Sequence, residues 1–86
     1  MALLDLLGRR WTLRILWELR SEALGFRELQ ARCDEMSPSV LNQRLRELKE
    51  AGIVESADAG YELTPRGGEL LHAFKPLERW AKSWRA

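Results

Sequence analysis

The stretch of residues 36–53 constrains the fold of this 86-residue chain more than any other; it reads M-S-P-S-V-L-N-Q-R-L-R-E-L-K-E-A-G-I. Ser37 suits the cap of a helix N-terminus, and Pro38 suits the first helical position, where no amide hydrogen is needed. Gly52 suits the left-handed residue that follows a helix, and a β-branched pair comes directly after it. The sequence therefore predicts a helix over about residues 38–51.

This predicted helix has one apolar face and one polar face. Its leucines recur at i, i+4 and i+7, which is a single helical stripe; they are Leu41, Leu45 and Leu48. The opposite face carries hydroxyl, amide and guanidinium groups at Ser39, Asn42, Gln43 and Arg46. Such groups read base edges in a DNA major groove. An ordinary solvated helix face has the same composition, so the choice between base reading and a solvated surface depends on the neighbouring elements.

Two helices are predicted before this one, after a short helical segment at residues 3–7. The first opens at Trp11 and reads L-R-I-L-W-E-L-R, with Leu13 and Trp17 among the side chains expected to be buried in the core. The second, R-E-L-Q-A-R-C, ends at Cys33 and is followed by a short polar turn. A helix, a tight turn and a capped second helix form the helix-turn-helix pattern. That context favours base reading over a merely solvated face.

After Gly52 the period changes from 3.6 to 2. Residues 54–56 and 61–63 read as the strands of a hairpin around a turn at residues 58–60. Thr64-Pro65 repeats the cap-plus-proline helix start, and Pro76 should kink or divide the last helix. We therefore expect a mostly α fold with a small hairpin (α+β). It is a winged helix-turn-helix with a three-helix core, a short wing and a C-terminal dimerisation helix, in one domain over residues 1–86.

Composition narrows the function classes. The net charge is only +1, so attraction to nucleic acid must come from the distribution of charge. The single cysteine, Cys33, allows no intrachain disulfide and reads as a core residue rather than a redox sensor. His72 has no second ligand at metal spacing, so no metal or cofactor is expected. No apolar run approaches membrane-spanning length, and we expect a cytoplasmic protein without a membrane partner.

Four segments carry a resemblance to a known family: L-L-G-R-R-W-T-L-R-I-L-W-E-L, G-F-R-E-L, S-P-S-V-L-N-Q-R-L-R-E-L-K-E-A-G-I-V and Y-E-L-T-P-R-G. With these segments the chain resembles the HxlR-type bacterial transcription regulators, which are relatives of the MarR winged helices. The resemblance covers nearly the whole chain. It implies a homodimeric regulator that binds double-stranded DNA, often in response to an electrophile, an oxidant or another small molecule.

Candidate phosphate contacts come from the resemblance and from position. The resemblance places Arg10 against a phosphate, and it places Ser37 and Arg44 in the reading helix. Arg9 and Arg27 are candidates because they lie at or near helix N-termini, with plain surface arginines as the alternative. Arg44 is either a clamp on the DNA backbone or an i, i+3 partner of Glu47.

The C-terminal helix has an aromatic stripe, since Trp80 and Trp84 are spaced i, i+4 and follow Leu77. A chain this small cannot easily bury four tryptophans alone, and an exposed apolar patch indicates a partner surface. We expect a symmetric homodimer with two reading helices about 34 Å apart. The candidate interface residues are Leu4, Phe74, Leu77, Trp80 and Trp84.

The chain departs from the family in two places. Family members usually carry an N-terminal arm with a Cys-Pro pair, whereas this sequence starts at the L-L-G segment, so a redox switch there is not inferred. The wing is also shorter, with Asp58 where a basic residue would favour phosphate.

The sequence has no nucleophile–base pair, no paired carboxylates in an apolar setting, no glycine-rich phosphate loop and no metal cluster, so an enzyme is not expected. The alternative function is a winged-helix protein–protein interaction module that does not bind DNA. A small-molecule effector between the aromatic helices, near Trp80 and Phe74, is a further candidate partner.

Overall fold

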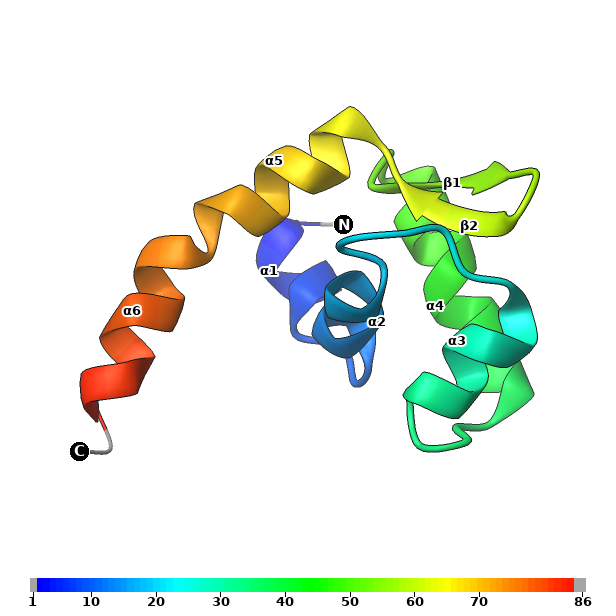
Figure 1. Ribbon diagram of the computed structural model, residues 1–86, viewed down its shortest axis with the longest axis horizontal. Coiled ribbons are helices and arrows are strands. Elements are labelled where there is room, and N and C mark those ends of the chain that lie inside the picture. Colours follow the sequence, from blue (N-terminus) through cyan, green and yellow to red (C-terminus); the bar gives the residue numbers. More distant parts are fainter. Residues whose placement is uncertain (1, 85–86) are drawn as a thin grey trace.

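The computed structural model describes residues 2–84 and has the predicted winged helix-turn-helix arrangement (Figure 1). Four helices come first, α1 (Leu3–Leu7), α2 (Thr12–Glu18), α3 (Phe26–Arg32) and α4 (Pro38–Glu50). An antiparallel hairpin follows, made of β1 (Val54–Ala57) and β2 (Gly60–Leu63). The helices α5 (Pro65–Ala73) and α6 (Lys75–Trp84) complete the described chain. The mixed α+β fold class is therefore confirmed.

Helix α4 begins and packs as its sequence predicts. The Ser37 hydroxyl accepts a hydrogen bond from the amide of Val40 at 3.5 Å, and Pro38 is the first helical residue. The three stripe leucines are buried, and they are Leu41, Leu45 and Leu48. Gly52 has φ +74°, the left-handed conformation that favours glycine after a helix end.

The turn between α3 and α4 is tight because two consecutive residues are left-handed. Asp34 has φ 58° and Glu35 has φ 55°. The side-chain amide of Gln30 closes the turn by donating to the Met36 carbonyl oxygen at 2.9 Å. The predicted polar turn thus positions α4 directly against α3.

The hairpin is anchored to the loop between α2 and α3. Leu24 and Tyr61 exchange two backbone hydrogen bonds, of 3.0 and 2.8 Å. Gly60, which we expected in the turn, instead pairs with Ala57 in the ladder and leaves a two-residue turn. Its position is explained by this contact, since a Cβ on Gly60 would lie 2.3 Å from the Leu24 carbonyl oxygen.

Thr64 and Gly67 join the start of α5 to the end of α4. The Thr64 hydroxyl accepts from the Gly67 amide at 3.0 Å, so the predicted cap is present. The same hydroxyl donates to the Gly52 carbonyl oxygen at 2.6 Å. Gly67 packs so closely on Ile53 that a Cβ would lie 2.2 Å from its carbonyl oxygen. This glycine is required for the contact between the two segments.

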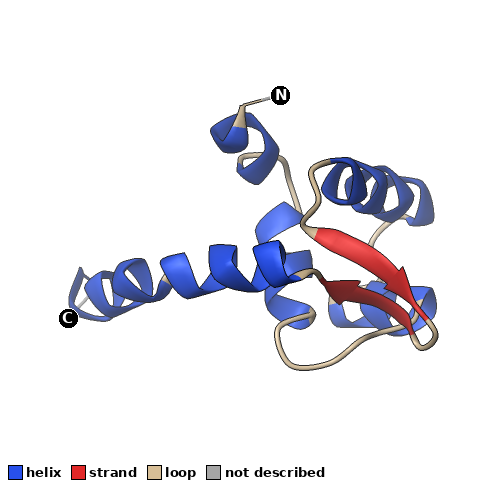
Figure 2. Cartoon of the chain, turned by 90° about the horizontal axis from the view of Figure 1, so that it is seen from above, coloured by secondary structure: helices blue, strands red, loops and turns tan. Residues whose placement is uncertain are grey.

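Helix α5 packs on the core at Leu70 and Leu71, whereas α6 extends away from it (Figures 1 and 2). Helix α5 ends at Ala73 and α6 begins at Lys75, so the predicted division near Pro76 is confirmed. No described residue of α6 is buried. The core lies instead among α1, α2, α3, α4 and the base of the hairpin.

The expectation that Leu13 and Trp17 are buried is wrong. Leu13 is 46% exposed and Trp17 is 44% exposed. Helix α2 turns its other face to the core, where Ile15 and Leu16 are completely buried. The spacing of Leu13 and Trp17 puts them together on the outer face of α2, which α5 and α6 cover only in part.

Candidate nucleic-acid interface

The polar face of α4 is open to solvent. The four side chains predicted to read bases are all exposed, and they are Ser39, Asn42, Gln43 and Arg46. They lie opposite the buried leucines of the same helix. The Ser39 hydroxyl lies 3.0 Å from that of Ser37, so the helix cap and the exposed polar face of α4 are in contact.

A chain of hydrogen bonds runs along this face. Arg46 donates from Nη1 to the Oε1 atom of Gln43 at 3.1 Å. Gln43 in turn donates from Nε2 to the Oε2 atom of Glu47 at 3.2 Å. The side chain of Asn42 makes no hydrogen bond within residues 2–84. Two candidate readers are therefore held in place, while a third is free to rotate.

Glu47 pairs with two of the arginines predicted to contact phosphate, Arg44 and Arg9. Its Oε1 atom accepts a hydrogen bond from Arg44, and its Oε2 atom lies 3.4 Å from Nε of Arg9. Burial opposes ionisation of Glu47, but its hydrogen bonds from Arg44 and Gln43 and the charges of Arg44 and Arg9 outweigh it and lower its pKa. Of the two alternatives for Arg44, the structure has the intrahelical ion pair.

Arg10 and Arg27 are differently placed. Both are exposed, and no ion pair holds either of them within the described chain. Arg10 lies beside Trp11, whose φ of 78° marks the sharp turn into α2. Arg27 lies in the first turn of α3. These two guanidinium groups are available to an anion at the surface.

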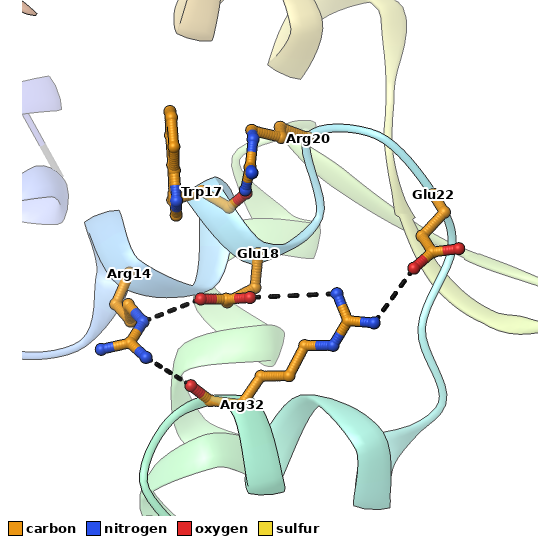
Figure 3. Close-up of polar contacts among 6 residues, drawn as sticks. All are labelled: Arg14, Trp17, Glu18, Arg20, Glu22 and Arg32. Carbon is orange, nitrogen blue, oxygen red and sulfur yellow. Dashed lines mark hydrogen bonds and ion pairs between the residues drawn. The ribbon is translucent and has the colours of Figure 1, made fainter.

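A network of ion pairs fixes α3 against α2 (Figure 3). Glu18 accepts from Nε of Arg14 at 2.9 Å and lies 4.0 Å from Nη1 of Arg32. Arg32 also pairs with Glu22 in the loop at 3.1 Å, and Arg14 donates to the carbonyl oxygen of Arg32. Only the i, i+4 spacing of Arg14 and Glu18 signals this network in the sequence. These contacts link α2, the loop that follows it and α3.

The wing and the C-terminal helix complete the surface. Asp58 is exposed at the hairpin tip. Among the candidate interface residues, Leu4 is the most exposed, Phe74 is half-buried, and Leu77, Trp80 and Trp84 are exposed. The rings of Trp80 and Trp84 stack with centroids 5.6 Å apart.

Side chains of α2, α5 and α6 line an open apolar groove of about 250 Å³. Its lining is almost entirely aliphatic and aromatic, and consists of Leu13, Trp17, Leu71, Phe74, Leu77, Glu78 and Ala81.

Cys33 is fully buried, as predicted, and burial raises the pKa of its thiol. Within residues 2–84 no group of three or more His, Cys, Asp or Glu side chains is placed to hold a metal ion. The same residues include no helix long and apolar enough to cross a membrane.

In this fold α4 is the second helix of the helix-turn-helix, its polar face is exposed, and a hairpin follows it. These features define a winged helix-turn-helix protein. The chain belongs to the HxlR-like helix-turn-helix family, whose sequence profile matches residues 6–86. It is 30% identical over 87 residues to the uncharacterised HTH-type transcriptional regulator YvaP of Bacillus subtilis, and the match spans 93% of this chain and 81% of YvaP.

Solved structures agree with this assignment. Quinone-bound YodB from B. subtilis superposes with a TM-score of 0.86 at 32% identity, covering 93% of this chain and 91% of that one. A MarR-family regulator from Enterococcus faecalis gives a TM-score of 0.85 at 30% identity, covering 95% of this chain and 81% of that one. The family is thus one of helix-turn-helix transcriptional regulators, with MarR-like structural neighbours.

Proposed function

We propose that this chain is a sequence-specific regulator of transcription that binds double-stranded DNA, with residues 1–86 acting as one domain. Helix α4 enters the major groove, where Ser39, Asn42, Gln43 and Arg46 contact base edges. The observation that carries the proposal is the exposed polar face of α4, whose opposite face is fixed by three buried leucines. An interaction helix would instead expose aromatic or aliphatic anchors on this face.

Phosphate contacts supply the electrostatic part of the proposed binding. Arg10 and Arg27 extend from the N-terminal ends of α2 and α3, where backbone N–H groups also favour anions. Ser37 is a further donor at the start of α4. Arg9 and Arg44 contribute positive charge while paired with Glu47. Since the net charge is close to zero, these local groups decide the attraction to DNA.

The proposed regulator acts as a homodimer. Helix α6 has no described buried residue, yet it exposes Leu77, Trp80 and Trp84 along one side. Together with Leu4 and Phe74 these side chains form an apolar surface that a second copy would cover. A two-fold dimer presents two copies of α4 to successive major grooves about 34 Å apart.

A small-molecule effector is also part of the proposal. The groove lined by Trp17, Phe74 and Leu77 has walls from the core helix α2 and from α6. A ligand there would change how α6 lies against the DNA-binding core, and so the spacing of the two readers. The quinone-bound state of YodB shows that a small molecule is found with that related protein.

Selection of bound duplexes from a random library at near-physiological salt tests the proposed function. We expect an enriched inverted repeat whose half-sites lie about one helical turn apart. Weak binding that depends steeply on salt, without enrichment of any sequence, would contradict the proposal. That result would favour the protein–protein interaction module.

A further inference from the structure

Glu47 does not belong to the exposed reading face, yet it is bonded to it. It accepts hydrogen bonds from Gln43 and Arg44, and it forms an ion pair with the Arg9 side chain from the loop between α1 and α2. Its own side chain is only 9% exposed. We propose, on the basis of the proposed function, that Glu47 is a positioning residue that fixes the orientation of the Gln43 amide and thereby the base that Gln43 selects.

Charges on both sides determine which way this amide points. The Arg46 guanidinium, which can only donate, lies 3.1 Å from Oε1 of Gln43. The Glu47 carboxylate, which can only accept when ionised, lies 3.2 Å from Nε2. A half-turn of the amide would set its NH₂ group against the guanidinium and its oxygen against the carboxylate. The observed orientation is therefore the only one in which both contacts are attractive.

The groups left over on Gln43 match a particular base. An amide nitrogen has two hydrogens and an amide oxygen has two lone pairs, and one of each is used within α4. One donor and one acceptor remain, in a fixed order. Adenine offers an acceptor at N7 and a donor at N6 side by side, whereas guanine offers two acceptors. A fixed amide therefore presents the complement of adenine in advance, whereas an amide free to turn also adopts the reverse order, in which it faces adenine with like groups.

Glu50 provides a matched control on the same helix. It has the same charge and lies three residues further along α4. It is exposed, and no ion pair or hydrogen bond of its side chain occurs within residues 2–84. Glu50→Gln changes the charge of the helix as Glu47→Gln does, but leaves the Gln43 amide untouched.

The experiment uses the sequence that the parent chain selects. Duplexes carrying each of the four base pairs at every position are titrated with the parent, Glu47→Gln, Glu50→Gln, Gln43→Ala and the double variant Gln43→Ala/Glu47→Gln. We expect Glu47→Gln to lower the discrimination at the single position read by Gln43 by about fivefold or more. Glu50→Gln should leave the discrimination unchanged, and Glu47→Gln should have no further effect on it once Gln43 is absent.

A second variant keeps the charge and protects the test against misfolding. Glu47→Asp withdraws the carboxylate by the length of about one C–C bond, about 1.5 Å, so the same loss of discrimination is expected. Equal weakening on all duplexes, or the same loss in the Gln43→Ala background, would mean a structural role and overturn the inference. An unchanged profile in both Glu47 variants would overturn it too. If the parent itself enriches no sequence, the proposed function fails first and the inference falls with it.

Discussion

The Thr64 hydroxyl donates a hydrogen bond to the carbonyl oxygen of Gly52 at 2.6 Å, and so ties the end of α4 to the start of α5. The Thr64 hydroxyl oxygen also accepts a hydrogen bond from the Gly67 amide at 3.0 Å, so this one side chain both caps α5 and ties α5 to the end of α4. The segment leading to α6 is thereby fixed relative to α4.

Removal of this hydroxyl should destabilise the fold. We expect Thr64→Ala to lower the free energy of unfolding by about 1–2 kcal/mol, because a cap and a tertiary hydrogen bond are lost together. Thr64→Ser retains the oxygen and should lose much less. Urea unfolding followed by circular dichroism measures both; equal losses would contradict the role of the hydroxyl.

The two adjacent glycines of α5 should respond in opposite directions. Gly67→Ala must displace the Ile53 carbonyl and should cost about 1–3 kcal/mol of stability. At Gly68 nothing lies within 4 Å of an added Cβ, so Gly68→Ala should stabilise the helix by about 0.5–1 kcal/mol. The unfolding temperatures of the two variants, measured side by side, test this prediction. A higher unfolding temperature for Gly67→Ala would contradict the close packing on Ile53.

Base readers and phosphate contacts should be separable by titration against matched duplexes. Gln43→Ala and Asn42→Ala should each cost about 1–3 kcal/mol and relax specificity at one base position. Arg10→Ala should weaken all duplexes alike and reduce the salt slope by about one unit. Full binding of the preferred site by the Gln43 and Asn42 variants would rule out the assignment of α4 as the reader.

Trp80, one of two exposed tryptophans of α6, should matter for assembly rather than for folding. Trp80 is 58% exposed, so Trp80→Ala should leave the unfolding temperature of a monomer nearly unchanged. We expect it to weaken self-association at least tenfold, as loss of a central aromatic anchor does. Sedimentation equilibrium over a range of concentrations measures this, with Arg79→Ala as the neighbouring control. A dimer as tight as the parent would place the interface elsewhere.

Acid should remove the contribution of Glu47 to stability. Despite the opposing effect of burial, hydrogen bonds and nearby arginines lower the pKa of Glu47 in the folded chain. The contribution of ionised Glu47 to folding stability is therefore complete at pH values above the pKa of the unfolded chain, about 4.3. It is lost as the pH falls through the pKa of the folded chain. The stability difference between the parent and Glu47→Gln should shrink over that window in urea titrations between pH 6 and 3. A difference independent of pH would show that the charge is not involved.

Sequence reasoning found the elements whose signals are local. The cap at Ser37, the stripe of Leu41, the left-handed Gly52 and the division near Pro76 each depend on residues within one or two turns, and the structure has all of them. Such features follow from helix and turn chemistry alone.

Contacts between distant segments were missed because they have no local signal. The residues around Gly67 do not show that Ile53 packs against it, and the i, i+3 spacing of Arg44 and Glu47 does not show that Arg9 also pairs with Glu47. Trp17 is exposed although its spacing predicts burial. Periodicity shows that a helix has an apolar side, but it does not show which neighbouring element covers that side.

Because Cys33 is buried, the rate at which a thiol reagent labels it reports local opening of the fold. It is the only cysteine in the sequence, it is completely enclosed at the end of α3, and its thiol is disfavoured as a thiolate. A thiol reagent can therefore reach it only when the junction of α3 and α4 opens. The rate of labelling therefore measures how often this junction opens, and a ligand that stabilises the helix-turn-helix will lower that rate.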